Sequence, residues 1–361
     1  MTIKAECKIT DFAEHFKKTL GWNKARASFF FLFISALIKL QTVCFTKLAT
    51  GFKKNVLVES NLRRIQRFFA DFSLDNSVIY KLIFSMLPEK PPYFLCIDRT
   101  NWKFGNTNIN ILMLSIAYRG VSIPIIWKML PKTGNSNWME RIDLMENYIH
   151  LFGKESIIAL LADREFIGDE WKEYLILNKI KFHIRIRGNM WVHRPNKKRV
   201  KAYWLFMSLP LNTPLYKRKI VRIGDQWMYL SGLKTLDEQN KIEYVIVASY
   251  CFDPLALENY KKRWQIESMF KAFKSSGFNL ESTHLSDLDR ISKMLSLISV
   301  AFVWAYLSGI YLNDNHKLIR IKKHGRKQYS FFKYGLIFLA NAFLNNDFCT
   351  IANFFKFLSC T

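Results

Sequence analysis

One stretch of the chain, residues 260–274, places a carboxylate, three cations and a phenol on one helix face. At ~100° per residue, these side chains fall within roughly 80° of arc. They are Tyr260, Arg263, Glu267, Lys271 and Lys274. A carboxylate among cations suits a site where a metal ion meets a phosphate chain. An exposed face with ordinary i,i+3 and i,i+4 ion pairs has the same spacing, so the rest of the chain must decide.

Two aspartates can complete such a site. Asp98 follows the apolar run Tyr93–Ile97, and Asp163 follows the run Ser156–Ala162. Both runs predict buried strands, and a charged residue just past a buried strand lies at the carboxyl edge of a sheet, where α/β folds place their sites. Either aspartate alone could be an ordinary turn former. Together with Glu267 they supply three hard oxygen ligands.

Three carboxylates suit Mg²⁺ or Mn²⁺. A pair of these ions suits in-line displacement at phosphorus, because one activates water or a 3′ hydroxyl and the other stabilises the leaving oxygen. The sequence therefore predicts metal-dependent phosphoryl transfer, with Asp98, Asp163 and Glu267 as ligands of two ions.

The elements that must position these residues form a mixed pattern. Apolar residues recur at helical spacing before the break at Leu87–Pro92. After it come three short strands, then helix, strand, helix and strand, which predicts an α/β fold with a mixed sheet. The expected segments are a helical domain at 1–90, a catalytic core at 91–187 and 251–312, a β-rich insertion at 188–250 and a basic helical C-terminal region at 313–361.

Charge indicates the partner. The formal net charge is +25, which favours a polyanion. The first 90 residues hold fifteen Lys or Arg against seven acids, residues 181–224 hold twelve against none, and residues 315–346 hold seven against none. A membrane anchor usually has one basic strip beside one apolar segment, so three dispersed regions favour DNA and no membrane.

Several other classes of site have no signature here. The six cysteines form no CxxC pair, and HExxH, P-loop and GxGxxG motifs are missing, so neither zinc nor nucleotide hydrolysis is expected. Reduced thiols in the cytosol are the expectation. The apolar run Leu295–Leu312 is expected to be a buried core helix, and the first residues do not predict a secretory signal.

These residues resemble a known family, the DDE transposases of bacterial insertion sequences, of the insertion-sequence-four family. That family carries Tyr-x2-Arg-x3-Glu-x6-Lys around its catalytic glutamate, and Tyr260, Arg263, Glu267 and Lys274 match this spacing. The family's second aspartate commonly begins an Asp-Arg-Glu-Phe string, present at residues 163–166. The resemblance covers roughly residues 60–335.

The resemblance implies a ribonuclease-H-like core and cut-and-paste transposition. The enzyme would cleave double-stranded DNA at terminal inverted repeats through a hairpin intermediate and join the 3′ ends to target DNA, working as a homodimer in the bacterial cytoplasm, at the nucleoid. A flipped base would stack on an aromatic side chain. Three residues of the insertion are candidates for it: Trp191, Trp204 and Trp227.

The remaining expectations concern DNA contacts. Six residues are expected to touch the DNA near the scissile phosphate: Tyr260, Arg263, Lys271, Lys274, Arg164 and Arg187. The helical region 1–90 is expected to bind the element's ends, with Arg63, Arg64 and Arg67 as possible readers of guanine. Two alternatives stay open: a metal-dependent nuclease or junction-resolving enzyme on the same core, and a non-catalytic basic protein that binds DNA or a membrane surface.

Overall fold

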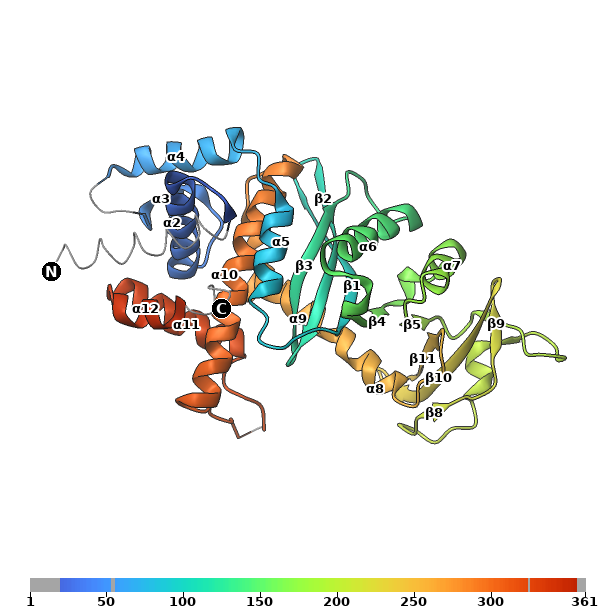
Figure 1. Ribbon diagram of the computed structural model, residues 1–361. Coiled ribbons are helices and arrows are strands. Elements are labelled where there is room, and N and C mark those ends of the chain that lie inside the picture. The colour runs from blue at the N-terminus through green and yellow to red at the C-terminus, as the bar shows by residue number, and fades with distance from the viewer. Residues whose placement is uncertain (1–19, 53–55, 324, 356–361) are drawn as a thin grey trace. The chain divides into compact units, whose positions relative to one another are not determined.

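The computed structural model describes residues 20–52, 56–323 and 325–355, and the chain divides into two compact units (Figure 1). The first unit comprises Met1–Glu89, Trp102–Ile109 and Phe270–Thr361. The second comprises Lys90–Asn101 and Asn110–Met269. The first unit therefore combines segments from before and after the second.

The first unit is built from helices. Side chains cap the start of four of them, which satisfies backbone N–H groups that a helix leaves free. These caps are Asn23, Asp75, Asp287 and Ser330. The helices are α2 (Lys24–Leu40), α3 (Phe45–Thr50), α4 (Val58–Asp71), α5 (Asn76–Ser85), α10 (Leu288–Asn315), α11 (Phe331–Leu344) and α12 (Phe348–Phe355).

Helix α10 is the centre of this unit and contains the expected core helix. Among the described residues, it is the one helix long and apolar enough to cross a membrane, and 94% of its apolar window is buried inside the protein. Helices α2, α5 and α11 pack against it. Its contact with α11 is close because Gly309 and Gly335 meet there; a Cβ on Gly309 would lie 1.8 Å from the carbonyl oxygen of Phe331.

The second unit is organised around a mixed sheet with the strand order β3-β2-β1-β4-β5-β11-β10-β8. Strands β1, β4 and β5 are parallel, whereas β2 pairs antiparallel with β3. This is the ribonuclease-H-like arrangement, so the expected α/β fold class is confirmed. The first five strands are β1 (Tyr93–Phe104), β2 (Thr107–Tyr118), β3 (Val121–Met129), β4 (Ile157–Ala162) and β5 (Phe182–Ile186).

Helices α6 (Trp138–Phe152) and α7 (Asp169–Leu177) make the crossover connections that parallel strands require. Helix α6 begins with a capping box, in which Asn137 and Glu140 each bind the other's backbone N–H. Two further helices, α8 (Ala256–Lys261) and α9 (Gln265–Lys271), with the 3₁₀ turn Lys262–Trp264 between them, carry the motif from Tyr260 to Lys271.

The region 188–250 contains the expected β structure, and its long strands extend the main sheet. Strand β11 pairs antiparallel with β5, and β10 pairs with β11. A buried lysine also ties this region to the core, because the Lys172 Nζ atom donates to the carbonyl of Ile223 at 2.7 Å. The strands are β6 (Trp191–Val192), β7 (Val200–Lys201), β8 (Leu215–Tyr216), β9 (Val221–Ile223), β10 (Gln226–Leu236) and β11 (Ile242–Ser249).

Two segments differ from the expected elements. Strand β1 was expected to end at Asp98 but continues to Phe104, because its second half forms a hairpin with β2 across Gly105. Within the expected helical C-terminal region, residues 316–323 and 325–330 are not helical; they precede α11, and Ile321 and Lys327 form an antiparallel bridge. The assignment of separate functions to the expected domains stays a prediction.

Candidate active site

Asp98 and Asp163 lie at the same edge of the sheet. The parallel pairing of β1 with β4 ends at Ile97 opposite Ala162, so both aspartates occupy the next position along their chains. Burial raises the pKa of Asp98 to about 6; the backbone N–H of Arg99 and the guanidinium of Arg263 oppose this rise, and the carboxylates of Glu165 and Asp163 add to it. Negative charge is therefore concentrated at this edge.

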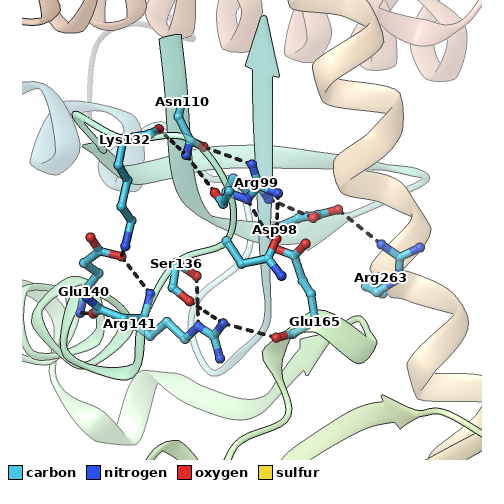
Figure 2. Close-up of polar contacts among 12 residues, drawn as sticks. Asp98, Arg99, Asn110, Lys132, Ser136, Glu140, Arg141, Glu165 and Arg263 are labelled. Carbon is cyan, nitrogen blue, oxygen red and sulfur yellow. Dashed lines mark hydrogen bonds and ion pairs between the residues drawn. The ribbon is translucent and has the colours of Figure 1, made fainter. Parts of the chain in front are cut away.

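The helical motif brings its first three members to these aspartates. The Arg263 Nη1 atom donates to Asp98 Oδ2 at 3.2 Å, and its Nη2 atom donates to Glu267 Oε1 at 2.6 Å. The Tyr260 hydroxyl donates to Asp163 Oδ1 at 3.4 Å. Arg263 thus joins Asp98 to Glu267, and the pair of Tyr260 and Asp163 interacts electrostatically with the same guanidinium. All five residues belong to the second unit, and Figure 2 shows Arg263 beside Asp98.

Arg263 supplies the positive charge at the centre of this group. Its side chain is only 7% exposed. Burial works to lower the pKa of Arg263. Its acidic and phenolic neighbours outweigh burial and raise the pKa above the ordinary value; they are Tyr260, Glu267, Asp98 and Asp163. The guanidinium therefore stays charged. Because one cation bridges two carboxylates, part of the repulsion that three acids would otherwise feel is removed.

The last two members of the motif belong to the first unit. Lys271 ends α9, and the chain then forms a π-helical turn over Ala272–Ser276, so Lys274 leaves the straight helical face that the sequence predicted. The Lys274 Nζ atom pairs with Glu281 Oε1 at 2.7 Å and lies 5.5 Å from the ring centroid of Trp102. The structure gives Lys274 these partners within its own unit.

A polar network connects the residues that follow Asp98 and Asp163 in the chain (Figure 2). Arg99, which follows Asp98, pairs with Glu165, two residues after Asp163, with 3.5 Å between Nε and Oε1. Arg99 also donates to Asn110 at 3.2 Å and to Asn135 at 3.0 Å. Arg141 donates to the backbone carbonyl of Glu165 at 3.1 Å. These bonds link the ends of β1 and β4 to the loop after β3.

Sequence reasoning assigned no role to Glu165. Its side chain is 26% exposed and contributes to the raised pKa of Asp98. The available signal was its place two residues after Asp163, where a short turn keeps it at the same sheet edge. Arg99 directly follows Asp98 in the sequence, and this position likewise indicated that it lies at the sheet edge.

Arg164 and Arg187 line a cavity of about 340 Å³ at the end of β5. Arg185, Tyr203 and Tyr244 line it too, and Arg185 pairs with Glu243. The cavity combines cationic and aromatic walls, which suits a phosphate with an adjoining base or sugar.

The three tryptophans proposed for base stacking are exposed but lie outside this cavity's lining. Trp191 and Trp227 are 45% exposed, and Trp204 is 57% exposed. Cations already cover Trp191, whose ring centroid lies 3.9 Å from Lys201 Nζ. Sequence reasoning did not consider Trp264, which is 64% exposed and follows Arg263 directly.

Asp98, Asp163 and Glu267 offer carboxylate oxygens, which are the ligands that Mg²⁺ and Mn²⁺ prefer. The raised pKa of Asp98 shows that its negative charge is poorly compensated, so a bound cation would stabilise it. Within the part of the chain that the structure describes, however, no three His, Cys, Asp or Glu side chains are close enough together to hold a metal ion. Arg263 binds two of the three predicted ligands instead. The arrangement is therefore that of a carboxylate site neutralised by an internal guanidinium.

Carboxylates at a sheet edge with basic neighbours are typical of enzymes that act on phosphodiesters. Comparison with known proteins gives the family: a model of the transposase DDE domain matches residues 89–304, and the chain belongs to that family. The chain is also similar to a solved transposase, the piggyBac synaptic complex with hairpin DNA, at 14% identity and a TM-score of 0.46, covering 90% of this chain and 73% of that one. A search of curated proteins gave no significant match.

Proposed function

We propose that this transposase cuts double-stranded DNA at the terminal inverted repeats of a mobile element and joins the 3′ ends to target DNA. The observation that carries the proposal is the group of Asp98, Asp163 and Glu267 around the guanidinium of Arg263. The spacing of Tyr260, Arg263, Glu267 and Lys274 supports a place in the insertion-sequence-four family.

Asp98, Asp163 and Glu267 would hold one or two divalent ions, Mg²⁺ or Mn²⁺. Such ions supply activation of the attacking water or 3′ hydroxyl and stabilisation of the leaving oxygen. Tyr260 keeps Asp163 in place through its hydrogen bond. Arg263 bonds to Asp98 and Glu267. With a divalent ion on these carboxylates, its guanidinium would donate to a DNA phosphate instead.

The DNA strand near the scissile phosphate would contact the cationic cavity of Arg164 and Arg187. A hairpin intermediate requires sharp bending of the strand, and an exposed aromatic ring stabilises the unstacked base that results. Trp264 joins Trp191, Trp204 and Trp227 as a candidate, because its exposed ring follows Arg263 in the chain. Two copies of the chain would act on paired ends in the bacterial cytoplasm.

The test uses the full-length protein, Mg²⁺, and a duplex carrying the end of the element that flanks the gene. We expect cleavage at the inverted repeat, hairpin-ended fragments on a denaturing gel, and joined products when target DNA is added. Cleavage of all duplexes alike, without joining, would identify a nuclease. Binding without any cleavage would identify a non-catalytic DNA-binding protein.

A further inference from the structure

The segment between α10 and α11 forms a short basic ribbon that the catalytic site does not use. We define the basic ribbon as residues Ile319–Lys323 and Gly325–Tyr329. The Gln328 N–H donates to the carbonyl of Arg320 at 2.8 Å, and the Lys322 N–H donates to the carbonyl of Arg326 at 2.9 Å. Ile321 and Lys327 form the bridge between these bonds.

Backbone contacts of the described residues set the register of the basic ribbon. The Gly325 N–H donates to the carbonyl of Lys322 at 2.9 Å, and Gly325 has a φ of +79°, which favours glycine. The antiparallel bridge between Ile321 and Lys327 places Arg320 opposite Gln328 and Lys322 opposite Arg326.

This register gathers cations on one face of the basic ribbon. Side chains alternate along a strand and opposite residues share a face, so Arg320, Lys322, Arg326 and Gln328 point the same way. All four side chains are exposed. The other face is different: it carries the buried Ile319, and the Lys327 Nζ atom lies 4.0 Å from the ring centroid of Phe331.

The cationic face has no acid within its own segment. Residues 315–346 contain no Asp or Glu, and Lys322 lies opposite Arg326. Arg320 and Lys322 form no ion pair with any described residue. The exposed charges of these two side chains are therefore available to a polyanion that lies along this face.

We propose that the basic ribbon is a second DNA-contacting element, which binds the phosphate backbone of duplex DNA through Arg320, Lys322 and Arg326. A two-stranded ribbon has the width that the major groove of B-DNA admits, so its cations can reach the phosphates that border the groove. Such contacts position the protein without reading sequence. The inference rests on the proposed function in taking DNA as the partner.

The test measures the salt dependence of binding to a random-sequence duplex of about 30 base pairs by fluorescence anisotropy, using the full-length protein. Each phosphate contact contributes roughly 0.9 to the slope of log K against log salt. Arg320→Gln with Lys322→Gln should therefore lower the slope by roughly 1.8. The loss of affinity should be equal on the inverted-repeat end and on random DNA.

Two controls accompany this variant. Lys154→Gln with Lys179→Gln removes the same charge from exposed residues beside the amino ends of β4 and β5 and should leave the slope unchanged. Arg320→Lys with Lys322→Arg keeps the charge and should bind as the parent does. Thermal unfolding of all variants checks that the fold is intact.

If the double variant Arg320→Gln with Lys322→Gln has the same slope of log K against log salt as the parent, the inference is overturned, whether or not the protein cleaves DNA. A loss confined to the inverted-repeat end would also overturn it, since the basic ribbon would then read sequence. Loss of binding to anionic lipid vesicles with DNA binding unchanged would assign the face to membranes. Failure of the parent to cleave DNA that it binds would defeat the proposed function but not this inference.

Discussion

At the scale of single residues, the site depends on how Asp98 is held. Its carboxylate is buried, bonded to the Arg99 N–H at 2.7 Å and paired with Arg263, yet its pKa is raised to about 6. Burial thus outweighs both favourable contacts. A carboxylate in this condition is costly to the folded protein and well suited to bind a cation.

The raised pKa of Asp98 predicts how stability changes with pH. Protonation favours the folded state, because the folded pKa of about 6 exceeds the ordinary 3.8. The resulting stabilisation is fully present below about pH 4 and is lost as the pH rises through about 6.

Asp98→Asn removes the buried charge and should raise the free energy of unfolding at about pH 8, with an upper bound of about 3 kcal/mol. The gain should disappear near pH 4. Urea unfolding without divalent ions measures it. A variant less stable than the parent at about pH 8 would contradict this explanation of the raised pKa.

At the scale of elements, the site depends on where α8 begins. Asp253 accepts from the Leu255 N–H at 2.8 Å, from Asn259 Nδ2 at 2.9 Å and from His183 Nε2 at 3.0 Å. His183 also bonds to the Ser249 hydroxyl at 2.8 Å. The start of the helix that carries Tyr260 is therefore fixed to β5 and β11.

Asp253→Ala should cost about 1–3 kcal/mol of stability, because it leaves buried polar groups without partners. It should also lower DNA cleavage, on the order of 10²-fold for an ångström of helix displacement. Asp237→Ala is the matched control, since Asp237 accepts two backbone N–H groups in the turn after β10, from Gln239 and Lys241. Equal cleavage rates for both variants would show that the hydrogen bonds of Asp253 do not position the site.

Much of the site's framework could be predicted from sequence. Short apolar runs ending at Asp98 and Asp163 specify buried strands, and helical spacing specifies the face with Tyr260, Arg263 and Glu267. The bond between Arg263 and Glu267 has the i,i+4 spacing of a helical ion pair, but the bond between Arg263 and Asp98 could not be predicted, because 165 residues separate them in the sequence. The π turn that contains Lys274 also could not be predicted, because it depends on the packing of Phe273 and Gly277 against other helices.

At the scale of the whole molecule, the N-terminal helices share one unit with the C-terminal helices. Helices α2, α4 and α5 contact α10, so a chain starting near Pro91 would expose the apolar surface of α10. Removal of residues 1–90 is therefore unsuitable as a test of end binding. Substitutions of exposed residues on α4 preserve the core.

Arg63, Arg64 and Arg67 are all exposed on α4, but the Arg64 guanidinium also lies over the Phe29 ring, 5.3 Å from its centroid. If α4 reads the element's ends, Arg63→Gln with Arg67→Gln should reduce the preference for the inverted repeat over random DNA. Each lost guanine contact should cost about 1–3 kcal/mol. Competition gel shifts measure the preference, and an equal loss on both DNAs would show phosphate contacts only.

The central claim is that Asp98, Asp163 and Glu267 together form the catalytic site. The most direct measurement is the rate of Mg²⁺-dependent cleavage of inverted-repeat DNA by Asp98→Asn, Asp163→Asn and Glu267→Gln. Substitution of residues that only support metal ligands typically lowers activity about 10–100-fold. Substitution of any one of the three predicted ligands should therefore lower the cleavage rate more than about 100-fold while DNA binding is retained. Asp143→Asn, at an exposed ion pair on α6, should cleave normally. Cleavage at the parental rate by any of the three would contradict the claim.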